Sequence, residues 1–136
     1  VANSVVPKFT FIVGNSYGAG NYAMCGKAYD PRLIYAFPTA NIAVMGGAQA
    51  SKTLLTIRLS ALEREGKVLG EDEQRKLLHD IQQRYDATTT PLYAASRLWV
   101  DGIVSPADTR SIVSRGLAMA SHNTDVPEWK SGVFQV

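Results

Sequence analysis

The sequence contains one cysteine, Cys25, and two histidines among its 136 residues. A single cysteine cannot form an internal disulfide, so the sequence excludes a disulfide-stapled scaffold and favours a reducing compartment. The histidines, His79 and His122, have no cysteine or carboxylate at the spacing of metal ligands, and we therefore expect no metal site. Cys25 itself is expected to serve as a small buried hydrophobic side chain.

Net charge and long apolar runs are also scarce. Fourteen Lys and Arg against twelve Asp and Glu leave a formal net charge of +2, and the basic residues are interspersed with acidic ones. A nucleic-acid partner usually requires a concentrated basic surface, so none is expected. No apolar run has the length of a membrane span, and no basic and apolar leader opens the sequence. These features predict a soluble, intracellular protein with no membrane partner.

The chain lacks an initiator methionine. Residues 1–7 lead directly into an apolar run with the character of a buried strand. We therefore expect the chain to be a fragment of a larger protein that keeps the natural C-terminus.

Alternating strand and helix patterns predict an α/β fold. Apolar and β-branched runs predict strands over residues 9–13, 33–37, 41–45 and 102–104, the first of them covered on both faces. Helical spacing and capping signals predict helices over residues 21–27, 48–65, 71–85, 91–98 and from about 106, followed by an irregular tail from 122. Three helical segments between the third and last strands indicate that partner elements lie outside the chain.

The two longest predicted helices have wide apolar faces, which usually mark an interface when nothing covers them. The first face is expected to comprise Ala50, Leu54, Ile57, Ala61 and Leu62, and the second Leu77, Leu78, Ile81 and Tyr85. We also expect Trp99, after the fourth predicted helix, to lie in the core.

A glycine-rich segment, residues 14–20, follows the first predicted strand and precedes a helix. Small residues let backbone N–H groups approach a bound oxygen closely, and the helix directs its positive end to the same place. We therefore predict a site for an anion or a developing oxyanion, built from main chain. Gly46 and Gly47 form a second strand-to-helix junction, which we expect to flank the same pocket. An alternative is that both junctions are ordinary tight turns.

Residues 14–18 also match G-x-S-x-G, the motif that places a serine nucleophile between a strand and a helix. Asp101 or Asp108, then His122, follow in the order found in α/β-hydrolases. A serine hydrolase acting through Ser16 is therefore the alternative from a different class. Against it, the histidine follows a helix rather than a central strand, and the chain is short for a hydrolase sheet. The same segment is also a weak candidate for phosphate binding, because it lacks the Lys-Ser/Thr ending of a P-loop and the full dinucleotide fingerprint.

Taken together, residues 14–32 resemble the C-terminal half of the carboxyltransferase β subunits of biotin-dependent acyl-CoA carboxylases, most closely the methylcrotonoyl-CoA type. The resemblance continues, in the same order and spacing, through residues 38–47, 94–104, 106–110 and 132–134. Residues 62–90 match mainly in character. Asn15 departs from the family, which often has glycine there, and Ala48 stands where close relatives tend to have an acid.

The resemblance implies a crotonase-like fold (ClpP/crotonase superfamily) of stacked ββα units, with residues 1–136 forming the C-terminal part of the biotin-side domain. It implies a hexameric, homo-oligomeric β core that moves CO₂ from carboxybiotin to an acyl-CoA. The favoured substrate is 3-methylcrotonoyl-CoA, in leucine degradation. Alternatives are a propionyl- or geranyl-CoA carboxylase β subunit, or a decarboxylase subunit of the same fold.

The resemblance also implies partners, a compartment and site residues. Biotin would be carried by a biotin carboxyl carrier or biotin carboxylase subunit, with no metal, in the bacterial cytoplasm (favoured) or the mitochondrial matrix of a eukaryote. The isolated segment would be inactive, and Ser16 would have no catalytic role. Backbone N–H groups of Ala19 and Gly20 would form the oxyanion hole for the ureido oxygen of biotin. Substrate would contact Gly18, Asn21, Tyr22, Gly46 and Gly47, with Tyr22 where related carboxylases vary their substrate-sensing side chain.

Overall fold

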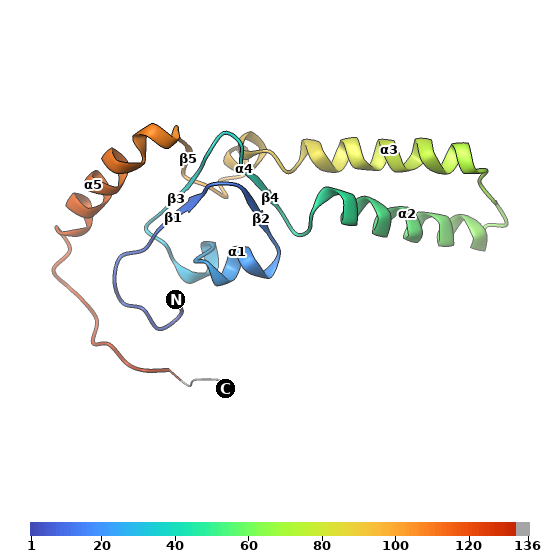
Figure 1. Cartoon of the computed structure of the whole chain (residues 1–136). Helices are drawn as coiled ribbons and strands as arrows, with labels where there is room; N and C mark the ends of the chain where they lie inside the picture. Colours follow the sequence, from blue (N-terminus) through green and yellow to red (C-terminus); the bar gives the residue numbers. More distant parts are fainter. Residues whose placement is uncertain (133–136) are drawn as a thin grey trace.

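The structure is a computed structural model that describes residues 1–132, so that Val133 and Phe134 of the last motif lie outside the described residues. Pairs of strands are interspersed with helices, as expected for an α/β fold (Figure 1). The elements are β1 (Phe9–Ile12), β2 (Asn15–Tyr17), α1 (Ala19–Ala23), η1 (Lys27–Tyr29), β3 (Leu33–Ala36), β4 (Asn41–Ala43), α2 (Gly47–Arg64), α3 (Glu71–Ala87), α4 (Pro91–Ser96), β5 (Gly102–Ile103), η2 (Pro106–Asp108) and α5 (Thr109–Ala120).

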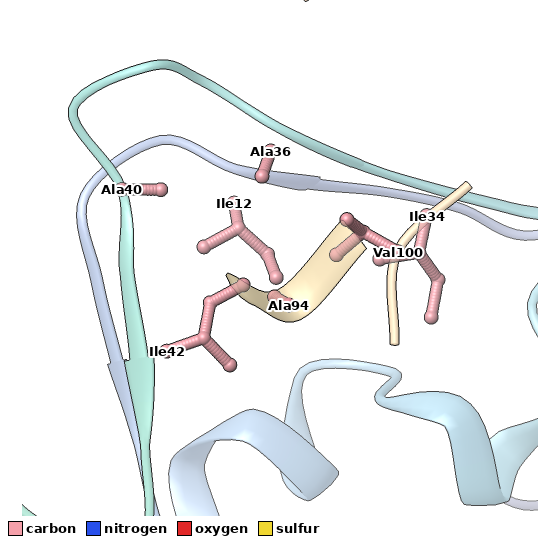
Figure 2. Close-up of a cluster of buried hydrophobic side chains, with 7 residues drawn as sticks. All are labelled: Ile12, Ile34, Ala36, Ala40, Ile42, Ala94 and Val100. Carbon is pink, nitrogen blue, oxygen red and sulfur yellow. The ribbon is translucent and has the colours of Figure 1, made fainter. Parts of the chain in front are cut away.

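The strands form two small parallel sheets that share a corner. β1, β3 and β5 lie side by side in one sheet, and β2 pairs with β4 in the other. The chain passes from β1 to β2 through Val13 and Gly14, and from β3 to β4 through residues 37–40. Figure 2 shows the second bend passing outside the first. Each bent segment therefore belongs to both sheets.

The strand β2 was not predicted, because residues 15–17 were expected to form part of a glycine-rich bend. The segment is short and polar and carries no strand periodicity. It becomes a strand by pairing with β4, where Asn15 lies opposite Asn41 and accepts a 3.1 Å hydrogen bond from its side chain. Tertiary pairing thus decides the conformation of this segment.

The helix α1 begins earlier and is shorter than the predicted helix over residues 21–27. Cys25 adopts a left-handed φ of 71°, and the carbonyl of Tyr22 accepts hydrogen bonds from the N–H groups of Cys25 and Gly26. A left-handed residue cannot continue a right-handed helix, so α1 ends and the short helix η1 follows. Cys25 is buried, as predicted.

The buried core is small and consists of isoleucine, alanine and valine between the strands and α4 (Figure 2). Its members are Ile12, Ile34, Ala36, Ala40, Ile42, Ala94 and Val100. The prediction that residues 9–13 are covered on both faces is wrong for this chain, because Phe9, Thr10 and Phe11 are only partly buried and Val13 is exposed. The accessible surface is 9891 Å², whereas a compact monomer of this mass exposes about 7,000 Å². The chain therefore presents a large surface that a compact monomer would bury.

The helices α2 and α3 pack against each other and project away from the sheets (Figure 1). The predicted face of α3 is confirmed, since Leu77, Leu78, Ile81 and Tyr85 are all partly buried. The predicted face of α2 is wrong at Leu54 and Ile57, which are exposed. Ala50, Ala61 and Leu62 of the predicted face are buried or partly buried, as expected. The other packed positions of α2 are Ser51, Leu55 and Leu59, spaced four residues apart. This spacing rotates the buried stripe and leaves Leu54 and Ile57 beside the contact. Within residues 1–132, no helix combines the length and the apolar character needed to cross a membrane.

Candidate functional site

Gly18 connects β2 to α1 and has a backbone conformation that favours glycine. Its φ is 54° and its ψ is −134°, and its N–H donates a 3.0 Å hydrogen bond to the carbonyl of Ala43. A Cβ at this position would lie 2.9 Å from the carbonyl oxygen of Val44. Both the positive φ and the close approach of this backbone oxygen exclude an ordinary side chain. Gly18 therefore fixes the direction in which the chain enters α1.

Two backbone N–H groups at the start of α1 are available to a ligand. The first N–H groups of a helix have no partner within the helix. Within residues 1–132, neither the N–H of Ala19 nor that of Gly20 donates a hydrogen bond, and both residues are exposed. Asn21, by contrast, donates its N–H to the carbonyl of Gly18 at 3.1 Å. Because α1 has only five residues, its dipole is small. Attraction of an anion at this turn would therefore come mainly from the two N–H groups.

Ser16 lies under this turn and positions Asn21. Its hydroxyl donates a 3.1 Å hydrogen bond to Oδ1 of Asn21. Asp101, one of the two acids considered for a hydrolase, accepts the N–H of Ile34 at 2.7 Å and pairs with Lys27 at 3.9 Å. No hydrogen bond in the described part of the chain joins Ser16 to a histidine or to an aspartate. The structure therefore does not assemble a serine triad around Ser16.

An apolar hollow of about 830 Å³ lies next to this turn. Gly18, Asn21 and Tyr22 line it on the side of α1, and Tyr22 is 58% exposed. Ala19 and Gly20 lie between these lining residues in the sequence but do not themselves line the hollow. Three of the predicted site residues thus line the hollow, and Ala19 and Gly20 lie between them in the chain.

Another part of the wall of the hollow comes from α4 and the turn after it, which sequence reasoning did not assign to the site. Leu98 and Trp99 line the hollow together with Tyr93. The ring of Tyr93 packs edge-on against Trp99 at 5.7 Å, and Trp99 is 47% exposed, so the prediction that it lies in the core is wrong. Leu98 has a left-handed φ of 58° and ends α4 in a position where glycine is usual. No local sequence signal marks a leucine for this conformation.

The second glycine junction is occupied by side chains of the chain itself. A Cβ at Gly46 would lie 3.6 Å from the ring of Tyr17, and a Cβ at Gly47 would overlap Oδ1 of Asp86 from α3. The carboxylate of Asp86 thus lies near the N-terminus of α2, where a negative charge is favoured. Neither glycine lines the hollow. The two glycine junctions therefore do not open onto one pocket in this chain.

The described residues hold no group of three or more His, Cys, Asp and Glu side chains that is arranged to bind a metal ion. Charged side chains do not gather at the hollow either, since Lys27 is the one charged residue among its described lining residues. What the arrangement offers chemically is a pair of backbone donors beside an apolar space. Such a pair can hold an oxygen on which negative charge develops.

Comparison with known families gives a match over almost the whole chain. The profile of the family described as carboxyl transferase domain matches residues 1–134. The chain is 46% identical over 136 residues to a probable mitochondrial methylcrotonoyl-CoA carboxylase beta chain of Drosophila melanogaster, covering 100% of this chain and 23% of that protein. It is 45% identical over 136 residues to a biotin-dependent 3-methylcrotonyl-coenzyme A carboxylase beta1 subunit of Mycobacterium tuberculosis, covering 100% of this chain and 26% of that protein. The chain thus spans about a quarter of the length of these relatives.

Solved structures give the same result for the fold. The beta subunit of geranyl-CoA carboxylase from P. aeruginosa superposes with a TM-score of 0.75 and 40% identity, covering 99% of this chain and 25% of that one. The transcarboxylase 12S structure superposes with a TM-score of 0.78 and 30% identity, covering 99% and 24%. These matches confirm the predicted crotonase-like α/β fold.

Proposed function

Because the chain belongs to the carboxyl transferase domain family, we propose that it is the C-terminal, biotin-side part of a longer β subunit of a biotin-dependent acyl-CoA carboxylase. In this proposal the subunit transfers CO₂ from carboxybiotin to an acyl-CoA. The observation that carries the proposal is the pair of N–H donors on Ala19 and Gly20, which have no acceptor among residues 1–132 and stand beside the apolar hollow. The chain matches only about a quarter of the length of its relatives, which supports the proposal that the whole subunit is longer.

The residues at the turn fit the biotin group chemically. Biotin combines a polar ureido carbonyl with an apolar ring, and when carboxylated it supplies the CO₂ that is transferred. Ala19 and Gly20 would donate their N–H groups to the ureido oxygen, while Tyr22 and the hollow would accommodate apolar parts of the ligands. Removing one such preorganised donor typically lowers kcat by about 10²–10³-fold. Gly18 holds both donors in place, and the bond from Ser16 to Asn21 stabilises the turn.

For the acyl substrate we propose 3-methylcrotonoyl-CoA, and hence a role in leucine degradation. Two relatives at 45% and 46% identity carry that substrate in their names, and a structural neighbour at 40% identity is named for geranyl-CoA. The proposed partners are a biotin carboxyl carrier or biotin carboxylase subunit and further copies of the β subunit in a hexameric core. The related transcarboxylase 12S protein, at 30% identity, assembles as a hexamer.

We propose a cytoplasmic location in a bacterium, which we favour, or the mitochondrial matrix in a eukaryote. Relatives from Drosophila melanogaster and Arabidopsis thaliana are labelled mitochondrial.

The proposal is tested by assaying the protein at its natural length. Together with a biotin carboxylase partner, ATP and labelled bicarbonate, it should transfer label to 3-methylcrotonoyl-CoA. A fluorophosphonate probe should leave Ser16 unmodified. Stoichiometric labelling of Ser16 without any carboxylation would instead support the serine hydrolase.

Replacement of Tyr22 by alanine or aspartate should change substrate choice. Tyr22 lines the hollow and is 58% exposed, so a smaller or charged side chain alters the space offered to the acyl chain. One methylene in a pocket is worth about 1–3 kcal/mol in specificity. The ratio of kcat/KM for 3-methylcrotonoyl-CoA to that for propionyl-CoA should therefore shift at least several-fold. Met24→Ala, at an exposed residue outside the hollow, is the matched control. Equal losses on both substrates would make Tyr22 a structural residue.

Replacement of Ser16 by alanine should leave carboxylation within about tenfold of the wild type. The variant loses the hydrogen bond to Asn21, which is typically worth about 0.5–1.5 kcal/mol, and keeps both backbone donors. Initial rates of carboxylation and a thermal unfolding curve check this. A loss of more than about a thousandfold in a folded variant would contradict the main-chain mechanism.

A further inference from the structure

The side chain of Asn21 lies in the wall of the apolar hollow, and one end of its amide is held from behind. Asn21 lines the hollow, whereas Ser16 does not. The hydroxyl of Ser16 donates a 3.1 Å hydrogen bond to Oδ1 of Asn21. The oxygen of the amide is therefore engaged by β2, and the nitrogen, Nδ2, is the end of the amide that remains for a ligand.

Nδ2 of Asn21 is a donor that the described part of the chain leaves free. It donates no hydrogen bond there, yet that part has no enclosed side-chain nitrogen or oxygen without a partner. Since Asn21 is only partly buried, its Nδ2 is accessible from outside. Hydroxyl groups in the same wall are instead engaged internally. Thr10 donates to the carbonyl of Cys25 at 2.8 Å, and Thr88 donates to a carbonyl of its own helix end at 2.7 Å.

The position of Asn21 in α1 places this donor near the two free N–H groups. Gly18 is the N-cap of α1, so Asn21 is the third residue of the helix. A side chain at the third position leans back towards the start of its helix. The backbone N–H of Asn21 is already bound to the carbonyl of Gly18 at 3.1 Å. The side-chain amide is therefore the group with which Asn21 can join the N–H groups of Ala19 and Gly20.

Ser16 decides which end of the amide is presented. An asparagine amide carries an acceptor at one end and a donor at the other, and a half-turn exchanges them. After such a turn Oδ1 would lie in the wall, with its lone pairs directed at a ligand oxygen. The hydroxyl of Ser16 has no other acceptor in the part of the chain that the structure describes, so the turn would cost it the bond that it donates. The hydroxyl thus favours the orientation in which Asn21 is a donor.

We propose that Nδ2 of Asn21 is a third donor to the ligand oxygen, and that Ser16 is the positioning residue that orients it. The inference rests on the proposed function, in which Ala19 and Gly20 donate to the ureido oxygen of biotin. A neutral carbonyl oxygen has two lone pairs, and an oxygen that carries a negative charge has three. A third donor therefore binds more strongly as the charge develops, which raises kcat more than it improves binding in the ground state.

Asn21→Asp tests the donor in the natural-length protein, assayed with its biotin carboxylase partner. Aspartate keeps an oxygen for the hydroxyl of Ser16 but has no Nδ2. The kcat should fall by about 10²–10³-fold, with KM for 3-methylcrotonoyl-CoA within about threefold of the wild type. A fall of less than tenfold in the folded variant, or a loss confined to KM, would overturn the proposal.

Asn15→Asp is the matched control. It introduces the same charge in the same segment, outside the hollow. Asn15 accepts a 3.1 Å hydrogen bond from Asn41 through Oδ1, which an aspartate also accepts. The control should remain within about threefold of the wild type. A loss in Asn15→Asp as large as that in Asn21→Asp would assign the effect to charge alone and would overturn the proposal.

A double-mutant cycle tests the positioning role of Ser16. Ser16→Ala should lower kcat about two- to tenfold, because the freed amide divides its time between two orientations. In an Asn21→Leu background, where no amide is present, Ser16→Ala should cause no further loss. Equal losses in both backgrounds would show that Ser16 acts through the turn and not through the amide.

A crystal structure of the natural-length protein with free biotin supplies a readout that does not depend on turnover or on any variant. Nδ2 of Asn21 should lie within about 3.2 Å of the ureido oxygen, the upper range of an N–H···O bond. A separation of more than about 4 Å would overturn the third donor. A wild-type protein that transfers no label refutes the proposed function itself. Transfer by the wild type and equally by folded Asn21→Asp refutes this inference alone.

Discussion

Replacing Gly18 with alanine should lower kcat/KM for carboxyl transfer by more than about a thousandfold in the natural-length protein. The new Cβ would lie 2.9 Å from the backbone oxygen of Val44, and the residue would have to keep a φ of 54°. An L-residue relieves this strain by changing its backbone conformation. The change reorients the N–H of Ala19 and displaces that of Gly20. Each donor is worth about 10²–10³-fold in kcat, so the loss of both exceeds a thousandfold.

Steady-state kinetics with 3-methylcrotonoyl-CoA measure this effect, and Gly14→Ala is the matched control. Gly14 also lies in the glycine-rich segment, but a Cβ there meets nothing within 4 Å and its φ is not positive. Gly14→Ala should therefore remain within about threefold of the wild type. A Gly18→Ala variant that keeps full activity would show that the turn does not hold the donors.

Gly20→Val separates obstruction of the site from distortion of the turn. A Cβ at Gly20 also meets nothing within 4 Å, so a side chain at this position starts in open space. The methyl groups of the valine occupy the space next to the free N–H groups. We therefore expect Gly20→Val to abolish activity while the thermal unfolding temperature of the natural-length protein changes by less than about 5 °C. A large drop in that temperature would assign Gly20 a structural role.

The 136-residue chain produced alone should neither remain monomeric nor unfold cooperatively. Within residues 1–132 the main buried cluster has seven residues, and large apolar side chains such as Val13, Val44 and Ile57 are exposed. The strand β1 pairs along one edge with β3, and no described strand pairs with its other edge. Open strand edges and exposed apolar patches promote association. The chain alone should also bind neither biotin nor CoA productively.

Sedimentation velocity and thermal denaturation followed by circular dichroism check this expectation. The natural-length protein is the control and should unfold in a sharp transition. A strictly monomeric 136-residue chain with a sharp, cooperative transition would show that the exposed surface does not depend on further partners.

How far the fold could be predicted depended on whether the deciding signal was local. The start of α2 at Gly47 and the helical face with Leu77 and Ile81 were predicted, because a glycine junction and a 3.6-residue period are visible in the sequence. The strand β2 and the end of α1 were not. The former requires pairing with β4, and the latter results from the left-handed conformation of Cys25, for which cysteine carries no preference.

The candidate site divides in the same way. The cluster from Gly18 to Tyr22 could be predicted because all its members are neighbours in one segment. Leu98 and Trp99 form another part of the wall only because α4 packs beneath the strands, which the sequence alone does not indicate. The contact between Gly47 and Asp86 likewise depends on how α3 folds back along α2. A glycine motif therefore indicates where a ligand could approach the backbone. Side chains from distant parts of the sequence, such as Asp86 at Gly47, decide whether that space is filled.

The corner that the two sheets share constrains the lengths of its two bends. β3 follows β1 in register at an offset of 24 residues, as in Phe9 with Leu33, whereas β4 follows β2 at an offset of 26, as in Asn15 with Asn41. The bend between β3 and β4 thus contains two residues more than the bend between β1 and β2, because it passes around the outside of the corner. Side chains alternate between the faces of a strand, and this arrangement directs both Ala36 of β3 and Ile42 of β4 into the core. A one-residue insertion between Ala36 and Asn41 would therefore move Ile42 out of the core unless the turn at Pro38 and Thr39 absorbed it.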